Sequence, residues 1–217
     1  MTIALIVIRY FALIISLVVH EYMHGLIAYW QGDETARRAG RLTLNPLVHV
    51  DMVGTVILPL AAIATGMPVF GWAKPVPFNP YNLRNQKWGA TMVGLAGPIS
   101  NFAMAAIFLE GLRVALINLN LSSENLLVIF LLNLAIVNIV LGIFNLIPVP
   151  PLDGSKLLAA LLDSPKYRNF LITLETKGPT ILMIVILFDA FSPHSFLGGI
   201  FSAVISGAFG LFGLGGF

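Results

Sequence analysis

Two histidines and a glutamate lie within five residues of one another in the segment HEYMH, residues 20–24. If this segment is helical, His20 and His24 share one face, because residues four apart lie one turn above each other. Their imidazoles can then bind one metal ion, with Glu21 beside it. The spacing H-E-x-x-H is typical of zinc metalloproteases, in which the glutamate takes a proton from the attacking water. These residues therefore indicate metal-assisted hydrolysis.

Catalytic zinc has three protein ligands and one open position, so a third ligand must come from elsewhere in the chain. Asp153 is the candidate, because it lies in the proline-rich run NLIPVPPLDG, residues 145–154. Its prolines prevent regular helix, and Gly154 permits a sharp turn, so the segment can aim one carboxylate at another helix. The alternative for Asp153 is a cap on a helix that starts at Gly154. His49 is a further candidate ligand, with a structural loop histidine as the alternative.

The residues around HEYMH are almost entirely apolar. Of the 217 residues, 58% are hydrophobic and only 10% are charged, whereas soluble domains carry about 25% charged residues. Several runs reach the roughly 20 apolar residues that cross a bilayer. The composition predicts a polytopic membrane protein with a hydrolytic site inside the bilayer. The chain has no cysteine, which excludes thiolate ligands, and a net charge of +2 gives no indication of nucleic acid binding.

We expect an all-α polytopic membrane protein that forms a single intramembrane domain over residues 1–217, with about five or six membrane segments. The expected core spans are residues 3–30, 88–118 and 124–147, and the C-terminal spans lie within 169–217.

Two segments between the first core spans are expected to differ from a simple membrane helix. Residues 52–70 are apolar but are broken by prolines and glycines, which favours a re-entrant segment. Thr43–Val50 is expected to be a small extended, β-like segment near the active site. Whether residues 52–70 and 194–217 cross the membrane fully is left open.

The distribution of basic residues predicts an orientation. The loops 31–51 and 71–87 each carry three of them: Arg37, Arg38 and Arg41 in the first, and Lys74, Arg84 and Lys87 in the second. Both loops are expected on the cytoplasmic side, which requires 52–70 to enter and leave on that side. The span 124–147 then brings Asp153 to the same side as His20 and His24. A full crossing by 52–70 would place Asp153 on the opposite face, and this variant stays open.

Three motifs in this order resemble the site-2 protease family, the intramembrane zinc metalloproteases of regulated intramembrane proteolysis. They are HEYMH in one span, GLAGPISN in a later span, and NLIPVPPLDG at the end of a third. The segments TLNPLVHVD and FGWAKPVPFN resemble the compact bacterial and archaeal members. The chain differs from the larger members in having no PDZ insertion between its spans.

The resemblance implies one Zn²⁺ per chain, with His20, His24 and Asp153 as ligands and Glu21 as the general base. It implies that Asn145 lies close to the substrate backbone or the developing oxyanion. Asn101 matches another polar family position, for which interhelical packing is the alternative.

The implied partners are the lipid bilayer and single-span transmembrane substrates, which the extended Thr43–Val50 and Trp72–Phe78 regions would bind by strand addition. The implied location is a prokaryotic plasma membrane, with the active site towards the cytoplasmic side. Substrate identity and oligomeric state, including a homo-oligomer, are left open. The competing functions are a membrane metal-binding or transport protein and a catalytically silent binder of membrane proteins.

Overall fold

The computed structural model describes residues 3–65, 71–192 and 195–215, and these residues form helices and loops without a β-strand. The longer helices are α1 (Ile3–Trp30), α4 (Gly89–Arg113), α5 (Leu126–Asn145), α7 (Arg168–Phe191) and α8 (Phe196–Leu211). The shorter α-helices are α2 (Thr35–Arg38), α3 (Leu58–Thr65) and α6 (Gly154–Leu161). Single 3₁₀ turns cover Pro46–Val48, Pro80–Asn82 and Pro165–Tyr167, and π-helical turns cover Met52–Ile57 and Val114–Asn118.

Four helical segments of the described chain are long and apolar enough to cross a membrane: Ala4–Trp30, Gly89–Asn118, Leu126–Asn145 and Pro165–Asp189. At about 1.5 Å per residue the 28 residues of α1 extend roughly 42 Å, more than the thickness of a hydrocarbon core. Three of these segments lie where the core spans were predicted and the fourth lies in the predicted C-terminal region, whereas the predicted total of five or six membrane segments stays a prediction. Two shorter apolar helices, Met52–Ala61 and Phe196–Leu211, are too short for the same assignment.

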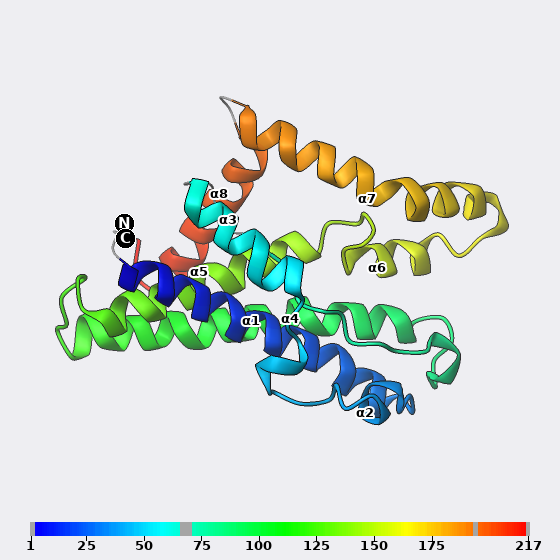
Figure 1. The fold of residues 1–217 in the computed structure, drawn as a ribbon, viewed down its shortest axis with the longest axis horizontal. Coiled ribbons are helices and arrows are strands. Elements are labelled where there is room, and N and C mark those ends of the chain that lie inside the picture. The colour runs from blue at the N-terminus through cyan, green and yellow to red at the C-terminus, as the bar shows by residue number, and fades with distance from the viewer. Residues whose placement is uncertain (1–2, 66–70, 193–194, 216–217) are drawn as a thin grey trace.

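The helices α1, α4 and α5 pack against one another and form the centre of the molecule (Figure 1). Leucine, valine, isoleucine and alanine side chains of α4 and α5 fill one core together with Phe209 of α8. A smaller cluster joins Leu13 and Leu17 of α1 to Ala73 in the loop that precedes α4. Helix α7 runs along one side, with little of its surface covered by the rest of the chain (Figure 1).

The predicted extended segment at Thr43–Val50 is wrong in its central part. Asn45 accepts a hydrogen bond from the Leu47 amide and caps the 3₁₀ turn Pro46–Val48, because Asn followed by Pro favours turn initiation. The extended backbone lies instead in residues 71–79, which we call the strap. The amides of Trp72, Lys74 and Val76 all donate inward, to Gly54 O, His49 O and Glu21 Oε2 respectively. That period of two is the pattern of an extended chain.

The hydrogen bond from Trp72 N to Gly54 O, 3.3 Å long, also brings the chain back to the start of the apolar segment 52–70. The Thr55 hydroxyl reinforces this return by donating to Trp72 O at 2.9 Å. Residues 66–70, at the far end of this segment, lie outside the described residues.

Candidate metal centre

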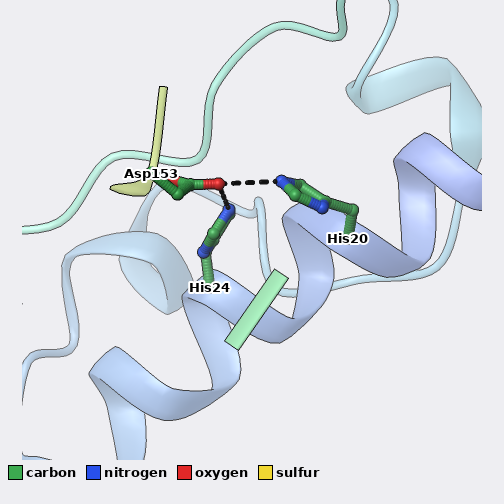
Figure 2. A group of neighbouring side chains, drawn as sticks. All are labelled: His20, His24 and Asp153. Atoms are coloured by element: carbon green, nitrogen blue, oxygen red, sulfur yellow. Dashed lines mark hydrogen bonds and ion pairs between the residues drawn. The ribbon is translucent and has the colours of Figure 1, made fainter. Parts of the chain in front are cut away.

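The side chains of His20, His24 and Asp153 meet in the interior of the molecule (Figure 2). Asp153 Oδ2 lies 3.1 Å from His20 Nε2 and 3.2 Å from His24 Nε2. All three residues are more than 90% buried. The two imidazole rings come from consecutive turns of α1 and are nearly perpendicular, with their planes 88° apart.

These three residues fit a zinc ion. Two ligand atoms of a tetrahedral zinc site, each about 2.1 Å from the metal, lie roughly 3.4 Å apart. The separations between Asp153 Oδ2 and the two Nε2 atoms are close to that value. Two imidazole nitrogens and one carboxylate oxygen are also a typical catalytic zinc set that leaves the fourth position for water or substrate. Without a metal, each Nε2 must carry a hydrogen to bond Asp153 Oδ2. A bound metal ion would take the place of those hydrogens.

Each histidine is oriented by a hydrogen bond at its other ring nitrogen. His20 Nδ1 lies 2.6 Å from Asn101 Oδ1, and His24 Nδ1 lies 2.7 Å from the carbonyl of Val93. Both acceptors belong to α4, so this helix holds both rings from behind. A histidine ligand commonly has such a partner, which fixes the ring and raises its basicity.

Asp153 occupies the residue before α6 but does not cap that helix through its side chain. The structure therefore favours the ligand over the capping alternative for this residue. The next residue, Gly154, has no room for a side chain, because a Cβ there would lie 2.2 Å from Leu146 O. The reason is close backbone approach rather than a special turn conformation.

The carboxylate of Asp153 is ionised by its surroundings. Its burial opposes ionisation, but hydrogen bonds with His20 and His24, and the positive charges of His24 and Lys156, outweigh this effect and hold the pKa of the carboxyl below its ordinary range. Lys156 Nζ lies 2.7 Å from Oδ1, the oxygen that faces away from the histidines. Oδ2 is left to serve as the single metal ligand.

Glu21 directly follows His20 on α1, and its carboxylate is held by the strap. Val76 N donates to Glu21 Oε2 at 2.8 Å, and Val76 has a proline on either side. Arg41 also holds the strap, by donating to Lys74 O at 2.6 Å and to Pro75 O at 3.3 Å. The expected base is therefore next to the metal ligands with one oxygen positioned by a backbone amide.

The other predicted site residues are placed differently. Asn101 is fully buried behind His20. Asn145 is the last residue of α5, half-buried, and donates to Leu141 O of its own helix at 3.0 Å. His49 lies apart from the triad, with Nε2 bonded to Thr43 O at 2.8 Å. The roles of Asn101 and Asn145 in substrate binding stay predictions.

Sequence reasoning missed three polar groups that support the site: Lys156 and the Val76 amide, which contact it, and Asn138, which contacts Asn101 behind it. Asn138 had a signal, because a polar residue inside the apolar run 126–145 needs a buried partner. Lys156 lies three residues after Asp153 on a short helix, a spacing that allows the pair to meet. The backbone amide of Val76 has no signal in the sequence.

Comparison with known proteins agrees with this site. The model of peptidase family M50 matches residues 112–187, a segment that contains Asp153 but not His20, Glu21 or His24. The "Putative zinc metalloprotease YwhC" of Bacillus subtilis is 36% identical over 177 residues, which cover 80% of this chain and 77% of that protein. No solved structure matches the chain significantly.

Two further relatives carry similar names. The "Putative zinc metalloprotease Rip2" of Mycolicibacterium smegmatis is 30% identical over 177 residues, covering 82% of this chain and 65% of that protein. The "Zinc metalloprotease MJ0392" of Methanocaldococcus jannaschii is 33% identical over 113 residues, 51% of this chain and 31% of that protein. The chain thus belongs to peptidase family M50, which confirms the resemblance to site-2 proteases. With its four apolar helices it is a multi-pass integral membrane protein.

Proposed function

We propose that this zinc metalloprotease is an intramembrane endopeptidase that cleaves transmembrane segments of single-span membrane proteins, with its catalytic apparatus in one domain over residues 1–217. The observation that carries the proposal is the meeting of His20, His24 and Asp153 beside Glu21 on a helix apolar enough to cross a bilayer. A hydrolytic site on such a helix has membrane-embedded peptide bonds within reach.

The residues of the chain divide the chemistry between them. Zinc, when bound by the two histidines and Asp153, supplies a Lewis acid that polarises the scissile carbonyl and acidifies water. Glu21 accepts the proton of the attacking water and returns it to the leaving amine. The Val76 amide keeps the Glu21 carboxylate in place between these two transfers.

The strap offers a route for substrate binding. Its even-numbered residues direct their amides inward, so residues 73, 75 and 77 face the opposite way in an extended chain. Residues 75 and 77 are prolines, so this edge carries mainly carbonyl acceptors, of which Pro75 O already accepts from Arg41 at 3.3 Å. We expect an unwound substrate to add along this edge and to supply most of the N–H donors itself. Prolines also prevent the edge from pairing with other strands.

The return of Trp72 to Gly54 supports a re-entrant path for residues 52–70, with both neighbouring loops on the cytoplasmic side. Because the chain has no cysteine, single cysteines at Gly40, Gln86 and Ser123 can report the topology in intact bacterial cells. An impermeant maleimide is expected to label position 123 and to spare positions 40 and 86. Labelling of 40 and 86 on opposite faces would refute the re-entrant path.

The test of the activity is cleavage of single-span model substrates by the purified protein in detergent. Glu21→Gln is expected to abolish cleavage while zinc stays bound, because the amide cannot accept the proton. Removal of zinc by a chelator is expected to abolish cleavage as well. Glu34→Gln is the matched control, since Glu34 pairs with Arg38 on the exposed surface and is expected to leave activity unchanged.

Two results would overturn the proposal. If Glu21→Gln cleaves at the wild-type rate, Glu21 is not the general base. A zinc-loaded wild type that cleaves no member of a panel of spans containing helix-breaking residues would favour metal binding or transport instead.

A further inference from the structure

A chain of buried polar side chains leads away from His20 through three helices. Asn101 of α4, which accepts from His20, donates through Nδ2 to Asn138 Oδ1 of α5 at 2.8 Å. Asn138 Nδ2 donates in turn to Ser16 Oγ at 2.8 Å, on α1 and one turn before His20. Ser16, Asn101 and Asn138 are each 0% exposed. The contacts form a closed loop from α1 through α4 and α5 back to α1.

Two backbone carbonyls at the far end of this chain of polar side chains determine which group donates in each of its hydrogen bonds. Asn138 Nδ2 lies 2.8 Å from Leu134 O, and Ser16 Oγ lies 2.7 Å from Ala12 O. A carbonyl oxygen only accepts hydrogen bonds, so the Asn138 nitrogen must face Leu134 and Ser16 must donate to Ala12. Both hydrogens of the Asn138 amide are then used, and its oxygen faces Asn101.

The same reasoning determines the donor in the hydrogen bond between Asn101 and His20. Because Asn138 presents an oxygen, Asn101 must present its nitrogen to Asn138 and its own oxygen to His20. An amide oxygen cannot donate, so His20 Nδ1 carries the hydrogen. Nε2, which faces Asp153 Oδ2 at 3.1 Å and can donate to it when no metal is bound, is then the ring nitrogen whose lone pair a metal ion would take.

We propose that Asn138 and Ser16, acting through Asn101, are positioning residues that fix the tautomer and ring orientation of His20 for metal binding. The inference rests on the metal site of the proposed function. Both polar atoms of the Asn101 side chain are engaged in this chain of contacts and the residue is 0% exposed, which favours a positioning role over contact with a substrate. His24 Nδ1 also carries a hydrogen, which it donates directly to the carbonyl of Val93.

The apolar surroundings make the arrangement strict. An unpaired polar group in such an interior is costly, so each amide is held to its assigned orientation. Removal of Asn138 leaves the Asn101 nitrogen without its acceptor and frees the Asn101 amide to turn over. A turned amide presents its nitrogen to His20 and favours the wrong tautomer. Loss of such an outer partner lowers metal affinity by roughly 10–100-fold in other metal sites.

The experiment measures the His20 tautomer directly in the full-length, zinc-free protein in detergent. The chain has four histidines, so ¹⁵N labelling of their rings gives few signals, which His→Gln variants assign. Wild-type His20 is expected to show a hydrogen on Nδ1, bonded to Asn101 Oδ1, whether or not Nε2 also carries one. Asn138→Leu is expected to give a mixture of rings with and without this Nδ1 hydrogen. Its zinc affinity, measured by competition with a chelator, is expected to fall about 10–100-fold.

Asn133→Leu is the matched control. Asn133 also lies on α5 and donates to the carbonyl four residues before it, Ile129 O at 2.7 Å, but it is only half-buried and has no contact with Asn101 or Ser16. This variant is expected to keep the wild-type tautomer and zinc affinity. If Asn138→Leu does not fold, Asn138→Ala removes the same amide without added bulk and decides the question.

Retention of the Nδ1 hydrogen and of the zinc affinity in the folded Asn138 variant would overturn the inference. Equal loss of zinc in the Asn138 and Asn133 variants, with no change of tautomer, would overturn it too, because it would indicate general loosening of α5. The tautomer is observed without metal or substrate. A protein that shows it but cleaves nothing would therefore refute the proposed function and leave the inference standing.

Discussion

Replacement of Gly97 by alanine is expected to disable the metal site while α4 stays helical. A Cβ at residue 97 would lie 2.5 Å from His20 Cε1, 2.6 Å from His20 Nε2 and 2.6 Å from His24 Cε1. Contacts below 3.0 Å essentially do not occur for real Cβ atoms, so something must shift. The atoms in conflict belong to the two ligand rings, one of them a ligand nitrogen.

The size of the shift follows from these distances. Ordinary contact begins at 3.4 Å, so the His20 ring must retreat by about 0.9 Å or α4 must move away by a similar amount. Neither ring can retreat freely, because Asn101 and the Val93 carbonyl hold them from α4 itself. Zinc sites tolerate about 0.2 Å in ligand distance. We therefore expect zinc affinity to fall on the order of 100-fold.

The assay is zinc affinity by chelator competition, together with the thermal unfolding of the zinc-free protein. Gly111→Ala is the control on the same helix, because its Cβ would meet only Leu131 methyl groups at 3.7 and 3.8 Å. Both alanines favour helix by up to about 1 kcal/mol, so neither zinc-free variant is expected to lose helical structure. Wild-type zinc affinity in Gly97→Ala would refute the reasoning, since it would mean that α4 yields without moving the ligands.

Two further predictions concern the strap. Val76→Pro removes the amide that donates to Glu21 and is expected to slow cleavage by roughly 10–100-fold with zinc retained, because a hydrogen bond to a charged group contributes about 1.5–3 kcal/mol. Val76→Ala keeps that amide and is expected to cleave faster than Val76→Pro, and equal rates in the two variants would contradict this account. Burial would raise the pKa of Asp33, but hydrogen bonds from Thr35, Asn82 and the Asn79 amide outweigh it and lower the pKa. Its stabilisation is then complete above the unfolded pKa of about 3.9 and is lost as the pH falls through the lower folded value. Asp33→Asn is therefore expected to lower the melting temperature of the zinc-free protein at neutral pH, and the gap to wild type should narrow below about pH 4. A gap independent of pH would contradict the role assigned to the Asp33 charge.

The main spans and the pair of histidines in HEYMH were predictable because each rests on a strong local signal. Apolar runs such as 126–145 have the length of a membrane crossing, and HEYMH carries its i,i+4 geometry within one helix. Asp153 was predictable only through the order of three motifs, because no local rule links residue 153 to residue 20. The structure supplies that link by packing α4 and α5 against α1.

The strap and the chain of amides behind His20 could not be predicted in the same way. Thr43–Val50 contains β-branched residues, but the Asn45-Pro46 pair starts a 3₁₀ turn, and this local turn chemistry prevailed over the expected extension. The extended backbone lies in 71–79, where its inward hydrogen bonds go to groups far apart in the sequence. Asn138 has a meaningful partner only once α4 and α5 are packed.

The positions of the small residues on α4 explain why the motif GLAGPISN accompanies HEYMH. Gly97 lets the helix approach within contact of both imidazole rings, and Asn101, one turn later, reaches His20 Nδ1 from the same face. A larger residue at 97 would hold α4 too far away for Asn101 to orient the ring. The glycine and the asparagine therefore serve one geometric requirement, and we expect a substitution at either position to be felt first as weaker metal binding, before any loss of the fold.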